Sequence, residues 1–367
     1  MKKIELTLAR DYVPSWTIVD GIRELFQNAL DQEVQCEGNT ASWEYSDGVL
    51  QIRNKKSVLA AKTLLLGCSS KRDDNKTIGQ FGEGYKIATL VLLREGKEIT
   101  IYNYGAREVW KPRFVKSRRF AADILTFFID KEYPWTKTPT DDLVIEVSGI
   151  TEDEWNNQIV PSNLSLHEYS IVESNGLGEV LDEETHAGMV YVNGLYVCKY
   201  DKYKYGYNFK PGNLKLDRDR KLASDFDLLW LASRMWADSP NALNLVEQDI
   251  ADVCYLSNIP AFTAKAKNID DAYLRFRSVY GPHAVPVSGQ FEADQVPEGY
   301  KPIFVSGNYR NLIIRSSMYE EPEEDLEEED TPIDKLEQWF KDVEDDLLSK
   351  DCNKFQEILE ELKEAYL

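Results

Sequence analysis

The sequence has few cysteines, and none of them has the paired spacing of a metal site. Five cysteines are scattered over 367 residues, an odd number without a Cys-x-x-Cys pair. This argues against a disulfide framework and against a zinc site. The three histidines, His167, His186 and His283, form no metal-like cluster either. Reduced thiols and solvated or hydrogen-bonded histidines are therefore expected.

A long apolar run is also lacking. No stretch approaches the roughly 20 apolar residues that are needed to cross a bilayer. The first eight residues alternate between polar and apolar side chains, which is typical of a strand and not of the apolar core of a signal peptide. We expect a cytoplasmic protein without membrane contact.

Basic residues are few near the end of the chain, where most of the negative charge lies. Of the net charge of −21, residues 319–367 carry −15, from 20 acidic and 5 basic side chains. The rest of the chain is only mildly acidic, which disfavours non-specific binding to DNA. One local basic cluster stays a candidate for DNA contact: Lys111, Arg113, Lys116, Arg118 and Arg119.

Apolar residues make up 43% of the sequence, enough for two folded domains and a tail. The late strands expected in residues 1–150 have short connections, which favours an antiparallel sheet in a layered α/β arrangement. The expected parts are an α/β domain at 1–150, a connecting segment at 151–185, a small α+β domain at 186–267, an α/β segment at 268–318, an acidic linker at 319–332 and a helical hairpin at 333–367. Within the second domain, residues 223–252 are expected to be one long helical region.

Residues 15–32 have helical spacing and carry three polar side chains on one face. Glu24, Asn28 and Asp31 stand at i, i+4 and i+7. A carboxylate and a carboxamide one turn apart suit a base that activates water beside an oxygen ligand for Mg²⁺. Taken alone, the same pattern also fits an ordinary amphipathic helix with a polar outer face.

A glycine-rich loop follows about fifty residues later and leads into another apolar helix. Gly79, Gly82 and Gly84 let the backbone approach a phosphate, and the helix after them offers free N–H groups. Lys86 stands in the first turn of that helix, where a cation can reach phosphates. The loop matches neither the dinucleotide fingerprint nor the Walker loop, and alone it fits a flexible turn.

Together the two elements resemble the GHKL ATPases, which include the gyrase B subunit, the ninety-kilodalton heat-shock chaperone, histidine kinases, MutL and MORC proteins. Residues 24–31 are similar to the family's N-box, and residues 79–84 to the chaperone's glycine box. Residues 67–86 look closest to MORC proteins, which have a lysine at the same place. The resemblance implies a Bergerat-type ATP-binding α/β sandwich, in an α+β chain with a smaller transducer-like domain and a helical acidic tail.

The resemblance also implies roles for individual residues. Glu24 would be the general base, and Asn28 would hold Mg²⁺ against the phosphates of ATP. Arg218, in the segment Leu-Asp-Arg-Asp at 216–219, is similar to the chaperone's arginine that reaches the γ-phosphate, although it also fits a surface charge cluster. The implied nucleotide-binding residues are Asn28, Asp31, Asn54, Gly79, Gln80, Phe81, Gly82, Gly84, Tyr85 and Lys86, with Asp31 expected mainly to support the helix.

The adenine end of the site departs from the family pattern. The family's Asp-x-Gly-x-Gly would follow the strand at 49–53, where this chain has Asn54, Lys55, Lys56 and Ser57. An Asn oxygen can still accept from the adenine amino group, but the charge and both glycines are missing. The usual Gly-Thr before the last strand is missing too, and Thr140 stands near that point.

The function expected from the sequence is Mg²⁺-dependent ATP binding with slow hydrolysis, which acts as a nucleotide-gated switch of conformation or dimerisation. Its client would be a protein or DNA. The alternative is an ATP-binding protein without hydrolysis whose acidic tail docks a partner.

Overall fold

The computed structural model describes residues 1–64, 84–131, 141–216, 222, 224–322, 332–344 and 347–366. The chain forms two compact units, Met1–Phe262 and Thr263–Leu367. The fold is α+β, which confirms the class expected from the sequence. In the described ranges, every helix falls short of the length and apolar content that spanning a membrane demands.

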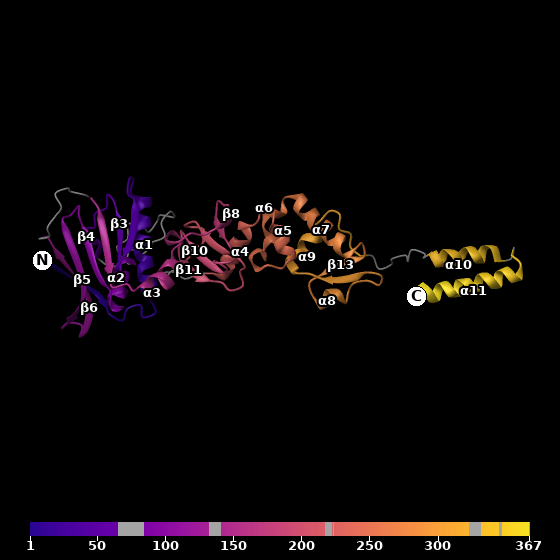
Figure 1. Cartoon of the computed structure of the whole chain (residues 1–367), viewed down its shortest axis with the longest axis horizontal. Helices are drawn as coiled ribbons and strands as arrows, with labels where there is room; N and C mark the ends of the chain where they lie inside the picture. The colour runs from indigo at the N-terminus through magenta and orange to yellow at the C-terminus, as the bar shows by residue number, and fades with distance from the viewer. Residues whose placement is uncertain are drawn as a thin grey trace. The chain divides into compact units, whose positions relative to one another are not determined.

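The first unit begins with a seven-stranded sheet in which all neighbouring strands are antiparallel (Figure 1), as the short connections predicted. Its spatial order is β1-β6-β5-β4-β7-β3-β2. The strands are β1 (Lys2–Ala9), β2 (Ala41–Ser46), β3 (Val49–Asn54), β4 (Glu98–Asn103), β5 (Glu108–Ser117), β6 (Ala122–Asp130) and β7 (Leu143–Ser148).

The alternation of apolar and polar side chains along the strands decides which face of this sheet the helices cover. On β3, Leu50, Ile52 and Asn54 are buried on the helix side, whereas Gln51 lies on the other face and donates to Glu146 on β7 at 2.9 Å. Burial of each large apolar side chain contributes about 1.5–3 kcal/mol. Because the period is two, one face of the sheet is a core and the other is polar.

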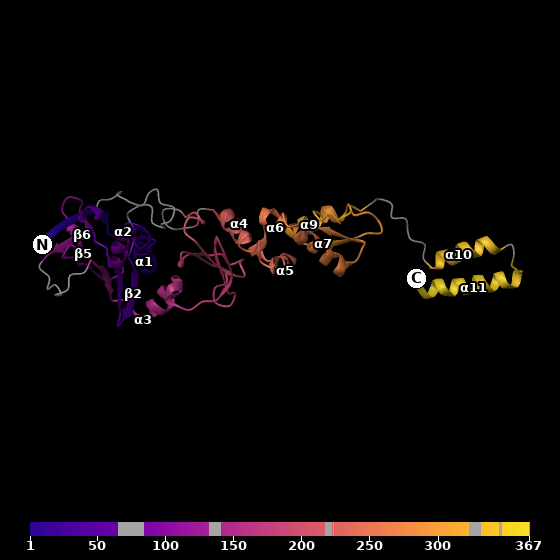
Figure 2. The same ribbon diagram turned by 90° about the horizontal axis from the view of Figure 1, so that it is seen from above.

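Two helices pack on the covered face, α1 (Ile18–Gln35) and α2 (Gly84–Arg94), and they contact each other (Figures 1 and 2). The helix α1 begins with a capping box between Thr17 and Asp20. Its Gly21 faces α2, where an added Cβ would lie 2.9 Å from Leu92 Cγ. The glycine therefore allows the close approach of the two helices that carry the predicted site. A short 3-10 turn, η1 (Ala61–Leu64), precedes residues 65–83.

The second sheet of this unit includes residues that the sequence predicted to be a connecting segment. Its order is β11-β10-β12-β9-β8, and only β10 and β12 pair in parallel. The strands are β8 (Ile171–Asn175), β9 (Gly178–Leu181), β10 (Met189–Val192), β11 (Leu195–Lys199) and β12 (Gly206–Phe209). The prediction for 151–185 misses β8 and β9. The edge strand β8 has no fully buried residue and its sequence lacks alternation, and β9 is only four residues long. Before it lie α3 (Glu152–Glu154), η2 (Trp155–Ile159), η3 (Val160–Ser162) and η4 (Leu164–Leu166).

The helical region predicted at 223–252 is not one helix. The chain forms α4 (Asp225–Met235), α5 (Ala242–Glu247), η5 (Ala251–Val253), η6 (Leu256–Asn258) and α6 (Pro260–Thr263). Pro240 explains the first break, because a proline disfavours helical geometry at the residue before it. That residue, Ser239, instead donates through its hydroxyl to Glu173 on β8.

Two histidines lie against each other beside the second sheet. The Nε2 atoms of His167 and His186 are 3.3 Å apart, and His186 Nδ1 lies 3.0 Å from Asp182 Oδ2. Since Asp182 accepts from the Nδ1–H, His186 Nε2 is left to accept from His167. Burial lowers the pKa of His167, and the neighbouring His186 lowers this pKa further.

We predict from the lowered pKa of His167 that the free energy of unfolding decreases in mild acid. Because the folded chain holds His167 below its ordinary pKa of about 6.5, the unfolded chain binds the proton first, and stability falls as the pH drops below 6.5. One proton gives at most about 1.4 kcal/mol per pH unit, and solvent around the half-buried ring reduces this. Urea unfolding between pH 5 and 8 checks it. The slope should weaken in His167→Gln and persist in His283→Gln, where the replaced ring is exposed.

The second unit contains a small parallel pair of strands and five helices within its described residues. Its elements are α7 (Ala266–Tyr280), β13 (Ala284–Val287), α8 (Gln290–Ala293), β14 (Lys301–Phe304), α9 (Gly307–Ile313), α10 (Pro332–Val343) and α11 (Ser349–Tyr366). The two last helices contact each other through Phe340 and Phe355, whose rings stack with centroids 4.4 Å apart.

Candidate nucleotide site

The predicted site helix is α1, and its polar face is buried. Glu24 is 1% exposed and Asp31 is 2% exposed, while Asn28 between them is half-buried. An ordinary amphipathic helix would turn such side chains to water, because burying a charge is costly. The polar face of α1 is therefore not the solvated outer face of an amphipathic helix.

The first residue of α2 lies directly against this face. A Cβ added to Gly84 would overlap Glu24 Oε2 and would lie 3.4 Å from Asn28 Nδ2. Only glycine lets the backbone come this close. The first amides of α2 have no partner within the helix, and they carry its positive dipole end. Glu24 and Asn28 thus lie beside a start of a helix that suits an anion.

Asn28 is held in one orientation. Its Nδ2 donates to the backbone carbonyl oxygen of Glu24 at 2.6 Å, so its Oδ1 is the atom left for another partner. An amide oxygen beside a carboxylate fits the oxygen ligands that Mg²⁺ prefers. Among the described residues, no group of three or more His, Cys, Asp or Glu side chains forms a metal cage.

Tyr85 and Lys86 connect the start of α2 to η1. The Lys86 side chain is fully buried and its Nζ donates to the backbone oxygen of Thr63 at 3.0 Å. The hydroxyl groups of Tyr85 and Thr63 are 3.0 Å apart. Burial raises the pKa of the Tyr85 phenol, and the contact with Thr63 lowers it by less. Both side chains thus anchor η1, and their contact with a nucleotide stays a prediction.

Asn54 lies at the end of β3, on the same face of the sheet as α1. Its Nδ2 donates to the backbone oxygen of Ala29 at 3.0 Å and to Oδ1 of Asn39 at 2.9 Å. Ala29 follows Asn28 on α1, so this carboxamide lies next to the metal-binding candidate. Two acceptors face the Asn54 side chain, which explains why a carboxylate would not fit here.

The structure brings Glu24, Asn28 and Gly84 together, and it bonds Asn54 to Ala29 on the same helix. Nothing in the sequence pointed to Thr63 or Asn39, because each takes part only through contacts between distant segments. Five of the predicted residues lie outside the described part of the chain: Gly79, Gln80, Phe81, Gly82 and Arg218.

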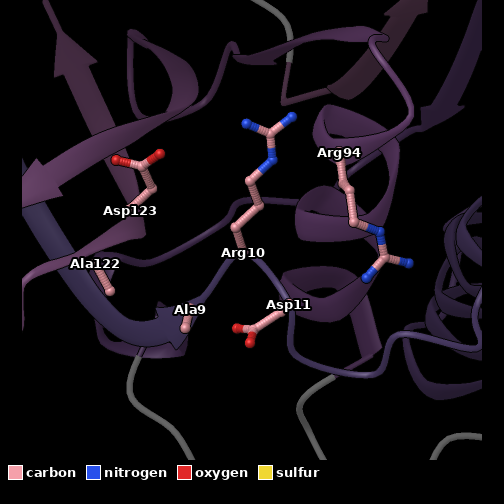
Figure 3. Close-up of a pocket in the computed structure, with 6 residues that line it drawn as sticks. All are labelled: Ala9, Arg10, Asp11, Arg94, Ala122 and Asp123. Atoms are coloured by element: carbon pink, nitrogen blue, oxygen red, sulfur yellow. The ribbon is translucent and has the colours of Figure 1, made fainter.

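A cavity of about 450 Å³ lies at the other end of α2 (Figure 3). It is lined by Ala9, Arg10, Asp11, Arg94, Ala122 and Asp123. Arg94, the last residue of α2, already donates to the backbone oxygens of Tyr12, Val13 and Trp16. Because this cavity is a whole helix away from Gly84, it is separate from the candidate site.

Two sequence comparisons find similarity to proteins of Mycoplasma pneumoniae. A family model described as the Mycoplasma pneumoniae MPN635 N-terminal domain matches residues 157–228, which include the whole second sheet. An uncharacterized protein of Mycoplasma pneumoniae (strain ATCC 29342 / M129 / Subtype 1) is 24% identical over 238 residues, covering 61% of this chain and 92% of that protein. Neither match describes an activity.

Solved structures similar to the chain include two ATPase domains. The ATPase region of Saccharomyces cerevisiae topoisomerase II has 11% identity and a TM-score of 0.35, over 60% of this chain and 82% of that one. The 43K ATPase domain of Thermus thermophilus gyrase B, solved in complex with an aminocoumarin, has 10% identity and a TM-score of 0.28, over 71% of this chain and 92% of that one. With identities and TM-scores this low, the site residues of these ATPase domains say nothing about individual residues of this chain, whose roles follow from its own geometry.

Proposed function

We propose that the chain binds ATP with Mg²⁺ and hydrolyses it slowly, as a GHKL-type ATPase. The observation that carries the proposal is the contact of the Glu24 carboxylate with Gly84 at the start of α2, with Asn28 beside it. A base, an oxygen ligand for a metal and an anion-binding helix start are the three parts that phosphoryl transfer to water needs. All three meet at one place.

The residues have separate parts in the proposed reaction. The amides at the start of α2 would stabilise the γ-phosphate. Glu24 takes a proton from the attacking water as the new P–O bond forms, and the bond to the bridging oxygen of ADP breaks. Asn28 Oδ1 would hold Mg²⁺, which neutralises charge on the phosphates. For Arg218 and the residues Gly79, Gln80, Phe81 and Gly82, phosphate contacts are proposed from the sequence resemblance alone.

The proposed switch starts from the link between α2 and η1. Because Lys86 and Tyr85 both bond Thr63, a phosphate that shifts the start of α2 also pulls on η1. Nucleotide binding would thereby change the conformation of the domain and favour a homodimer, and slow reopening would limit turnover. The client, protein or DNA, is not specified by the site.

Light scattering with a non-hydrolysable ATP analogue tests this proposal. With Mg²⁺ present, the analogue should bind and raise the average mass toward that of a dimer, and binding should weaken when Mg²⁺ is removed with a chelator. ADP serves as the matched control and should leave the mass unchanged. If neither nucleotide binds in either condition, the proposed function is wrong.

Replacing Gly84 by Ala is expected to lower hydrolysis at least tenfold. The added methyl group overlaps Glu24 Oε2, so the carboxylate has to leave its place, and small misplacements of a reacting group cost large factors in rate. Phosphate release at saturating ATP measures the effect. Gly307→Ala is the matched control, because Gly307 also begins a helix but has no atom within 4 Å of the added carbon. A Gly84→Ala protein with unchanged turnover would contradict the assignment of the base.

The second candidate is an ATP-binding protein without hydrolysis that docks a partner through its tail. One observation favours it: on the acidic pair α10 and α11, apolar side chains are exposed, with Trp339 at 50% and Ile358 at 48%. Exposed aromatic residues are enriched at protein interfaces. Phosphate release by the unmodified protein separates this candidate from the first.

A further inference from the structure

The orientation of two buried carboxamides at the end of β3 is fixed by a backbone carbonyl. Ala29 O can only accept, so the Asn54 atom that faces it at 3.0 Å is Nδ2. The second hydrogen of this Nδ2 points to Asn39, whose facing atom at 2.9 Å must then be Oδ1. The carbonyl of Ala29 fixes which way the Asn54 amide points, and Asn54 in turn fixes the Asn39 amide. Neither amide can be flipped without losing a hydrogen bond.

This chain of bonds leaves one donor unused. Asn39 is 4% exposed, and among the described residues its Nδ2 has no hydrogen-bond partner. Leaving such a buried donor unpaired is costly. Buried amides are almost always paired, so this donor can serve an acceptor that the described residues do not supply. On Asn54, both hydrogens of Nδ2 are already donated, so Oδ1 is the atom left for a further hydrogen bond, and it can only accept.

The donor and the acceptor belong to two carboxamides that are bonded to each other, and such a pair can match the edge of a nucleobase. Adenine presents its exocyclic amine, which donates, next to ring nitrogen N1, which accepts. A carboxylate in place of Asn54 would offer acceptors only, and it would repel both Ala29 O and Asn39 Oδ1. Asn39 and Asn54 thus offer two neutral contacts to the base at the place where the family pattern has one aspartate.

We propose that Asn39 Nδ2 donates to N1 of the adenine of ATP, while Asn54 Oδ1 accepts from the adenine amine. Asn39 is then a specificity-determining residue of the nucleotide site. This inference depends on the proposed function, since it names the contacts of the base in the same site.

Two ATP analogues that each lack one ring nitrogen test the proposal on the unmodified, full-length chain. With Mg²⁺ present, 1-deaza-ATP should bind about tenfold more weakly than ATP, the factor for one hydrogen bond of about 1.4 kcal/mol. The analogue 7-deaza-ATP should bind like ATP. Equal binding of all three nucleotides, or a loss with 7-deaza-ATP alone, would overturn the assignment of N1.

A substitution then connects this preference to Asn39. In Asn39→Ala, ATP should bind about tenfold more weakly, and the difference between ATP and 1-deaza-ATP should disappear. Asn103→Ala is the matched control. Asn103 is a fully buried carboxamide at the same end of the sheet, but both of its polar atoms bond the backbone of Leu59. Its loss should lower stability and leave the tenfold preference intact.

The outcomes distinguish the two proposals. If ATP itself does not bind to the unmodified chain, the proposed function fails. If ATP binds and Asn39→Ala keeps the preference for ATP over 1-deaza-ATP, only the role of Asn39 is wrong.

Discussion

A Glu24→Gln protein is expected to bind ATP and release almost no phosphate. Glutamine has the shape of glutamate but cannot take a proton from water, and loss of a general base costs about 10²–10⁴-fold in rate. Its carboxamide still fits the space against Gly84, so the site keeps its form. Phosphate release at saturating ATP, together with the affinity for a non-hydrolysable analogue, measures the two effects separately.

The control for Glu24 lies on the same helix. Glu33 is exposed, so Glu33→Gln makes the same chemical change away from the buried face and should leave phosphate release unchanged. If Glu24→Gln releases phosphate at the rate of the unmodified chain, the chain is not an ATPase of this type. If both the unmodified chain and Glu24→Gln bind ATP but release no phosphate, the non-hydrolysing candidate is supported.

Spacing in the sequence was enough to predict that Glu24 and Asn28 lie on one face of a helix. Glu24 and Asn28 are one helical turn apart, and that local geometry holds wherever the helix packs. The glycine at position 84 was also predicted, because a close approach of backbone to a charged group needs a residue without Cβ. Spacing did not predict that Gly84 would meet Glu24, since this contact joins segments about sixty residues apart.

The parts that the sequence did not predict depend on contacts between distant segments. The donor and acceptor atoms of Asn54 are assigned by Ala29 and Asn39, and no local pattern contains that information. The edge strand β8 has no buried face, so periodicity could not reveal it. By contrast, the break after α4 had a local cause in the sequence, Pro240, and the long helical region at 223–252 was predicted without that break.

Replacing Asp252 by Asn is expected to destabilise the first unit by about 3 kcal/mol. Asp252 is fully buried, and its carboxylate accepts from the backbone N–H groups of Lys204 and Tyr205 at 2.9 and 3.1 Å and from the Tyr207 hydroxyl at 2.7 Å. Burial raises its pKa, and these donors lower the pKa part of the way back. An asparagine would turn an NH₂ group toward one of the donors, which leaves two buried donors facing each other. Urea unfolding of the full chain measures the loss.

The Asp252 network also separates a structural role from a role in the nucleotide site. Tyr207 belongs to β12, and its hydroxyl accepts at 2.9 Å from Nε1 of Trp236, the C-cap residue of α4. The network therefore holds the second sheet to the end of α4. Tyr207→Phe should cost less than Asp252→Asn, about 1–2 kcal/mol, because the two backbone donors keep their acceptor. Nucleotide affinity should be unchanged in both proteins, since Glu24, Asn28 and Gly84 belong to the first sheet and its helices. A drop in ATP affinity of more than about threefold in the folded Asp252→Asn protein would instead mean that the second sheet contributes to the nucleotide site.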